Sequence, residues 1–195
     1  MTKLDELKRH LKPGDVYRRE DLARWSNAVD RHIKALLDDG TLTKLAGGLY
    51  LRPKETVFGK APPEDTRLVE SFLKDRHFLL ASPNLYNSLG VGTTQLYDKT
   101  VVYNRKRHGN FALGGRMFDF RVKPSFPKHL SREFLLVDLV NNVDRLAESR
   151  DEVLTRVRER AGAFDLRRLQ RAARDYGNVR TKKFFSQALS ELHVN

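Results

Sequence analysis

SNAVDRHIKALLDDGTLTKLAGGLY, residues 26–50, is the stretch that decides the fold of the first part of this chain. Its first half predicts a helix, because apolar side chains recur at a spacing that places them on one face: Val29, Ile33, Leu36 and Leu37. Ser26 or Asn27 stands where a side-chain oxygen caps the start of a helix. Gly40 stands where a helix ends. We therefore expect a helix with one buried face.

The second half of the stretch predicts a two-stranded hairpin. Thr41 to Leu45 and Leu49 to Arg52 alternate between apolar and polar residues. Between them, Ala46-Gly47-Gly48 provides the tight reversal that a short hairpin needs. The helix should therefore run directly into a hairpin.

Two further helices are predicted upstream. Leu4, Leu7 and Leu11 mark a first helix, which Pro13-Gly14 stops, and Arg19 to Trp25 is long enough for a second. The complete order is helix, short strand, helix, helix and hairpin. This is the order of a winged helix-turn-helix, so we predict a DNA-binding domain over residues 1–52.

The predicted third helix carries its hydrogen-bond donors on the side opposite its apolar face. Asn27, Arg31 and Lys34 fall there, and such side chains suit phosphates or base edges. An alternative is that these charges only keep the surface solvated. The full set of candidate DNA-binding residues is Arg18, Arg19, Ser26, Asn27, Arg31, Lys34, Lys44, Gly47, Gly48 and Arg52.

The overall charge favours a polyanionic partner. The chain has 37 Lys and Arg against 25 Asp and Glu, a formal net charge of +12, and its sequence pI is about 10.1. The excess is spread along the chain, so it is also compatible with RNA or an acidic protein as the partner.

The composition changes at residues 53–63, where prolines and a glycine interrupt any periodic pattern. With Arg52 before it, this segment reads RPKETVFGKAPP. Val57 and Phe58 within it favour a docked linker. Residues 64–195 are predicted to form an α+β domain, because strand-like segments at residues 100–104 and 111–120 precede helices that begin near Ser131. We thus expect an α+β protein with a winged helix, a small antiparallel sheet and C-terminal helices.

This second domain contains a second candidate basic surface. A dense basic turn follows Asn104, and Arg-rich helical segments lie near the C-terminus. In the strand that ends at Lys123, alternation predicts that Arg121 and Lys123 point away from the apolar face. Phosphates, an acidic protein surface or solvent would each suit these charges. The residues are Arg105, Lys106, Arg107, Arg121, Lys123, Arg167, Arg171 and Arg174.

Sequence motifs for catalysis are lacking. The chain has no cysteine, and its six histidines do not have metal-ligand spacing. It also has no phosphate-binding loop, no nucleophile elbow and no paired carboxylates suited to two-metal chemistry. We therefore expect no catalytic residues, no metal and no cofactor.

The sequence also predicts a cytoplasmic protein with no membrane partner. No segment approaches the roughly 20 apolar residues that a membrane-spanning helix needs. The N-terminus is amphipathic and charged, unlike a secretory signal. The lack of cysteine fits a reducing compartment.

The region from about Asp21 to Ala147 resembles the AbiEi family of antitoxins from type IV toxin–antitoxin systems. The resemblance rests on an ordered set of landmarks, among them a glycine hairpin before an alternating, arginine-rich strand. The others are Gly48-Leu49-Tyr50, Pro53, Phe58-Gly59 before Pro62-Pro63, and Leu89-Gly90 followed by Thr93-Thr94-Gln95. The chain departs from many members at Ala46-Gly47, where those members have basic residues.

The resemblance implies a repressor whose winged helix binds repeats in its own promoter as double-stranded DNA. It also implies a second domain that acts in antitoxicity, with a neighbouring nucleotidyltransferase-like toxin as partner. A monomer in solution that binds cooperatively on DNA is compatible with this role. The alternative function is an RNA-binding or protein-interaction module that uses the basic hairpin and the Arg-rich C-terminal helices.

Overall fold

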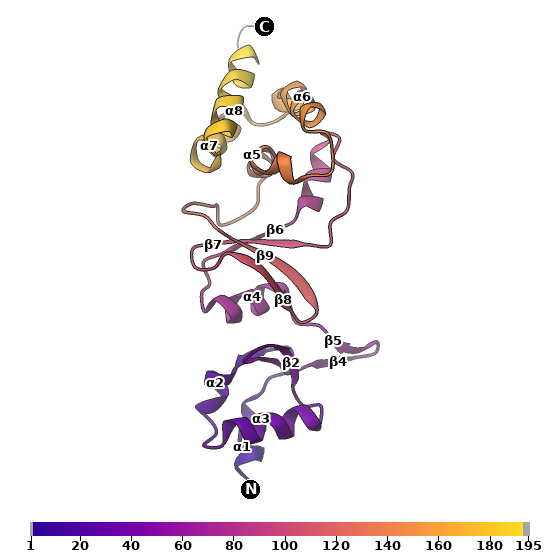
Figure 1. The fold of residues 1–195 in the computed structure, drawn as a ribbon, viewed down its shortest axis with the longest axis vertical. Helices are drawn as coiled ribbons and strands as arrows, with labels where there is room; N and C mark the ends of the chain where they lie inside the picture. The colour runs from indigo at the N-terminus through magenta and orange to yellow at the C-terminus, as the bar shows by residue number, and fades with distance from the viewer. Residues whose placement is uncertain (1, 193–195) are drawn as a thin grey trace. The chain divides into compact units, whose positions relative to one another are not determined.

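The structure, a computed structural model, describes residues 2–192 and has an α+β fold (Figure 1). The chain divides into two compact units, Met1–His77 with Asn110–Phe118, and Phe78–Gly109 with Asp119–Asn195. The terminal residues 1 and 193–195, which include His193, lie outside the described part. The two units are described separately below.

The first unit contains the predicted winged helix. Its three-stranded antiparallel sheet has the order β1-β3-β2. The elements are α1 (Lys3–His10), β1 (Val16–Arg18), α2 (Arg19–Ala23), α3 (Val29–Asp38), β2 (Thr43–Ala46) and β3 (Leu49–Leu51). The predicted order of helices and strands over residues 1–52 is therefore confirmed.

Helix α3 buries the apolar face that its sequence predicts. Ile33 and Leu36 are buried in a core shared with Leu7 and Leu22 of the other two helices. Gly40 follows the helix with a φ of 73°, a left-handed conformation that glycine adopts without strain. The expected burial and helix end are both confirmed.

The predicted cap of α3 is wrong. The N-cap residue is Ala28, and neither Ser26 nor Asn27 caps the helix. The Ser26 hydroxyl instead accepts a hydrogen bond from the Ala28 backbone N–H at 3.2 Å. The helix starts one residue later than a cap at Asn27 predicts and two later than a cap at Ser26 predicts, because this local turn satisfies Ser26 before the helix begins.

Residues 53–63 are not docked through the apolar pair that suggested it. They contain a hairpin of β4 (Lys54–Thr56) and β5 (Gly59–Ala61), whose tip residues Val57 and Phe58 are 92% and 97% exposed. The hairpin is fixed instead through Lys60, whose ammonium donates to the Gly40 carbonyl at 3.1 Å. The apolar pair that suggested docking lies in solvent.

The structure also corrects the predicted domain boundary. Helix α4 (Asp65–Leu73) lies beyond the predicted linker but belongs to the first unit. Arg67 pairs with Asp15, and Lys74, just after the helix, pairs with Glu20. The prolines interrupt the sequence pattern, but α4 beyond them still packs with the first unit. Composition alone therefore misplaces the boundary between the two units.

A four-stranded sheet follows, with the order β6-β7-β9-β8. Its strands are β6 (Leu79–Ala81), β7 (Thr100–Asn104), β8 (Gly109–Leu113) and β9 (Arg116–Val122). Gly114 and Gly115, with φ of 58° and 78°, form the tight reversal between β8 and β9. This confirms the second glycine hairpin predicted from the sequence.

The helices of the second unit surround α5, which is buried along nearly its whole length. It packs against η1, α7 and α8 (Figure 1). The elements are η1 (Pro83–Leu89), α5 (Arg132–Asn142), η2 (Val143–Arg145), α6 (Arg150–Arg160), η3 (Ala161–Ala163), α7 (Leu166–Tyr176) and α8 (Val179–Leu192). Within residues 2–192, none of the helices has the length and apolar character needed to span a bilayer.

Candidate nucleic-acid interface

The exposed side of α3 presents the cations that the sequence predicts there. Arg31 and Lys34 are exposed, as is Asn27 just before the helix. Within residues 2–192, the side chains of Arg31 and Lys34 make no hydrogen bond or ion pair. Their donors are therefore available to an external acceptor.

Two arginines at the start of α2 are already paired. The Arg19 guanidinium makes a two-point contact with Asp30 of α3, at 2.7 and 2.6 Å. This contact lowers the pKa of the Asp30 carboxyl. Arg18 pairs with Glu20 and Asp21. These two predicted contact residues thus tie local elements together, and their charge is partly neutralised.

Ser26 lies inside the first unit. Its side chain is buried, and its hydroxyl shares a 2.7 Å hydrogen bond with Nδ1 of His32, which is also buried. The same hydroxyl holds the turn at Ala28. Ser26 therefore positions α3 instead of presenting a donor to solvent.

We expect Ser26→Ala to lower the free energy of unfolding by about 1 kcal/mol, because it removes a buried hydrogen bond and leaves His32 unpaired. Urea denaturation should detect the change. Asn27→Ala is the matched control, since Asn27 is the exposed neighbour. An Asn27→Ala change that destabilised the protein as much as Ser26→Ala would contradict this structural role.

The hairpin of β2 and β3 is the wing that follows α3. Lys44 is exposed on β2, and Gly47-Gly48 makes the turn. Arg52 is half-buried, and its guanidinium donates to the Thr41 carbonyl at 3.2 Å. Lys44 is thus placed for an external contact, whereas Arg52 fixes the base of the wing.

Arg24 is an exposed cation of the helix-turn-helix that the sequence pattern does not single out. Arg24 is the C-cap residue of α2 and is exposed in the turn that leads to α3. No pattern marks it, since a charged residue between two helices is ordinary. Its place at the end of the predicted second helix, two residues before Ser26, is the signal that could have identified it.

The predicted second basic surface occupies several different environments. Arg105, Lys106 and Arg107 are exposed in the turn between β7 and β8. The buried Asn104 side chain holds this turn, because its Oδ1 accepts from the backbone N–H groups of Lys106 and Arg107 at 2.8 and 2.7 Å. The turn is an ordered loop of cations.

Arg121 and Lys123 point away from the apolar face of β9, as predicted, but neither is an exposed surface cation. Both are half-buried: Arg121 donates to Asp119 and Asn142, and the Lys123 ammonium lies 3.6 Å from Asp138. Lys123 also stands 4.3 Å from the centre of the Tyr103 ring. Alternation places the two residues on the correct side of β9, but helix α5 covers that side.

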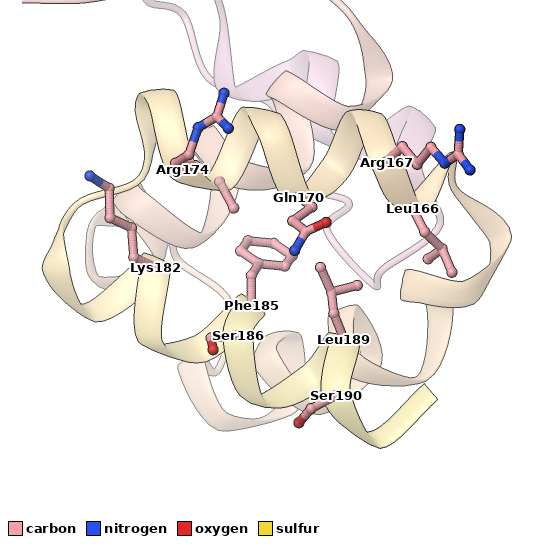
Figure 2. Close-up of a pocket in the computed structure, with 10 residues that line it drawn as sticks. Leu166, Arg167, Gln170, Arg174, Lys182, Phe185, Ser186, Leu189 and Ser190 are labelled. Carbon is pink, nitrogen blue, oxygen red and sulfur yellow. The ribbon is translucent and has the colours of Figure 1, made fainter. Parts of the chain in front are cut away.

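The Arg-rich C-terminal helices line a groove between α7 and α8 (Figure 2). The groove has a volume of about 420 Å³ and includes the apolar side chains Leu166, Phe185 and Leu189. Arg167, Arg174 and Lys182 supply its cations. Arg171 is exposed on α7 but is not one of the residues that line the groove.

Acidic and histidine side chains do not gather into a ligand set in the described part of the chain. Over residues 2–192, no group of three or more His, Asp or Glu is arranged to hold a metal ion.

A comparison with solved structures supports the fold. The chain is similar to the Rv2827c protein from Mycobacterium tuberculosis, known from a crystal structure, with a TM-score of 0.57 and 18% sequence identity. The similarity covers 96% of this chain and 74% of Rv2827c. No protein-family model and no curated protein matches the chain. The comparison therefore establishes the fold, which is α+β, and nothing beyond it.

Proposed function

We propose that this protein is a transcriptional repressor that binds double-stranded DNA through α3 and the β2–β3 wing. The observation that carries the proposal is the two-sided character of α3. One side is buried in the core, while Arg31 and Lys34 on the other side have no partner within residues 2–192. A helix of this kind fits the major groove, and bidentate donors there distinguish base pairs.

The more specific role is that of an autoregulating antitoxin of the AbiEi type, acting in the cytoplasm. Its support is the ordered series of sequence landmarks from the wing to the second glycine hairpin, together with the winged-helix arrangement of the first unit. In this role the protein binds repeats in its own promoter. Its second unit acts on a nucleotidyltransferase-like toxin.

Protein interaction is a second candidate function, and the groove between α7 and α8 favours it. The groove combines apolar side chains with Arg167, Arg174 and Lys182. Apolar surface flanked by cations suits an acidic protein segment better than it suits a nucleic-acid backbone.

The test is binding of the purified full chain to about 200 base pairs upstream of its gene, compared with scrambled DNA across a salt series. Repression predicts a preference for the native fragment that persists at physiological salt. Stepwise saturation of that fragment would further indicate cooperative binding to repeats. Equal binding to both fragments that disappears with salt would overturn the repressor assignment, since phosphate contacts alone carry no sequence information.

A further inference from the structure

A small cavity in the second unit is lined by cations and lacks an acidic wall. It has a volume of about 200 Å³. Three cationic side chains line it, Lys99, Arg121 and Arg145, beside the polar groups of Tyr86, Tyr97 and Asn142. No Asp or Glu is among its lining residues in the described part of the chain. This composition favours an anionic occupant.

Two of these cations are held in fixed positions. The carboxylate of Asp119 accepts from Arg121 at 3.0 and 2.7 Å and lies 3.1 Å from the Lys99 ammonium. Arg121 also donates to the Asn142 side-chain oxygen at 2.8 Å. Burial acts to raise the pKa of Asp119, but the bonds from Arg121 and Lys99 outweigh it and lower the pKa. Asp119 is therefore ionised and orients both cations.

The third cation supplies uncompensated charge. Arg145 on η2 is exposed, and within residues 2–192 its side chain makes no hydrogen bond or ion pair. Asp119 thus balances one positive charge where three surround the cavity. The Arg145 guanidinium has free donors and lies beside the partly buried Lys99 and Arg121. It can bind an oxyanion well, because its planar fork donates to two oxygens at once.

The acidic groups near the cavity are committed to internal donors. Asp138 accepts from the hydroxyls of Tyr86 and Tyr103, each at 2.6 Å. Glu148 accepts from the backbone N–H groups of Thr94 and Gln95 at 2.9 and 3.1 Å. Asp138 is in addition paired with Lys123, and neither carboxylate forms an ion pair with Arg145 within residues 2–192.

We propose that this cavity binds a phosphate-type oxyanion, either inorganic phosphate or the phosphate of a small phosphomonoester. Its volume is below the roughly 300–1,000 Å³ that drug-sized ligands occupy, which favours a compact group. The occupant would contact Arg145 directly and complete the charge balance of Lys99 and Arg121. This site is separate from the proposed DNA contacts on α3 and does not depend on them.

Isothermal titration calorimetry on the full chain tests the proposal, with inorganic phosphate and AMP as probes. Inorganic phosphate should bind saturably at a single site. Arg145→Ala should weaken it at least fivefold, and because Arg145 has no internal partner the variant should fold normally. Arg171→Ala is the matched control, since it removes the same charge from an exposed position on α7 that does not line the cavity.

The outcomes separate the two sources of phosphate and the failure of the proposal. If AMP binds more tightly than inorganic phosphate, and Arg145→Ala weakens the binding of both by the same factor, the occupant of the cavity is a phosphomonoester. Equal or stronger binding of inorganic phosphate assigns the free anion. Absence of saturable binding by both probes overturns the proposal. The proposal is also overturned if Arg171→Ala weakens phosphate binding as much as Arg145→Ala does, because that would indicate general electrostatic attraction. It is overturned as well if Arg145→Ala changes the binding of duplex DNA but not the binding of phosphate.

Discussion

Replacing Asp138 by alanine is expected to lower the free energy of unfolding by about 3–5 kcal/mol, because it breaks a buried charged network. Asp138 on α5 is fully buried and accepts from the hydroxyls of Tyr86 and Tyr103. It is also the anionic partner of the half-buried Lys123, whose pKa burial lowers. Without the carboxylate, two hydroxyls and one ammonium lose their acceptor together.

Urea denaturation followed by circular dichroism measures the loss. Asp138→Asn should cost less, since it keeps one acceptor oxygen. Tyr103→Phe should cost about 1–2 kcal/mol, because it removes one donor to the same carboxylate. Asp144→Ala is the surface control and should leave the midpoint unchanged, as Asp144 makes only exposed ion pairs. A midpoint for Asp138→Ala close to that of Asp144→Ala would rule out the structural role of the network.

The double variant Arg31→Ala/Lys34→Ala should lose most of the preference for promoter DNA, by about 100-fold in the ratio of specific to scrambled binding. Each good base contact contributes about 1–3 kcal/mol of discrimination. Both residues lie on the exposed side of α3, outside the core, so the fold should be retained. Fluorescence anisotropy with native and scrambled fragments at physiological salt measures the ratio.

Arg105→Ala/Arg107→Ala is the matched control for that experiment. It removes two exposed cations from the turn between β7 and β8. It should weaken binding to both fragments alike and reduce the salt dependence, as loss of phosphate contacts does. If this control abolished the preference and the α3 variant did not, the basic turn would carry DNA recognition, and the assignment of the specific contacts to α3 would be wrong.

Local pattern was sufficient to predict the winged helix. The apolar spacing from Val29 to Leu36 fixes which side of α3 faces the core, and Gly40 ends the helix through its left-handed backbone. The two glycine reversals fix the hairpins after α3 and before β9 in the same manner. These features are encoded within a few residues of one another, so no distant contact is needed to specify them.

Side-chain environments in the candidate sites required the tertiary structure. The pattern identified Ser26 as a cap and contact residue, but His32, six residues away, draws it into the core. The apolar character of Phe58 predicted docking, although the β4–β5 hairpin leaves it exposed. In each case the burial of the side chain depends on which other residues the folded chain places next to it.

The sequence by itself determined the helices and the β2–β3 hairpin of residues 1–52 and the side of β9 on which Arg121 lies. It did not determine that α5 covers this side, which converts an expected surface cation into one wall of a cavity with Lys99 and Arg145. The physical reason is the distance along the chain over which each kind of information acts. Periodicity records the direction of a side chain relative to its own backbone, whereas burial and charge pairing depend on contacts between segments far apart in the chain.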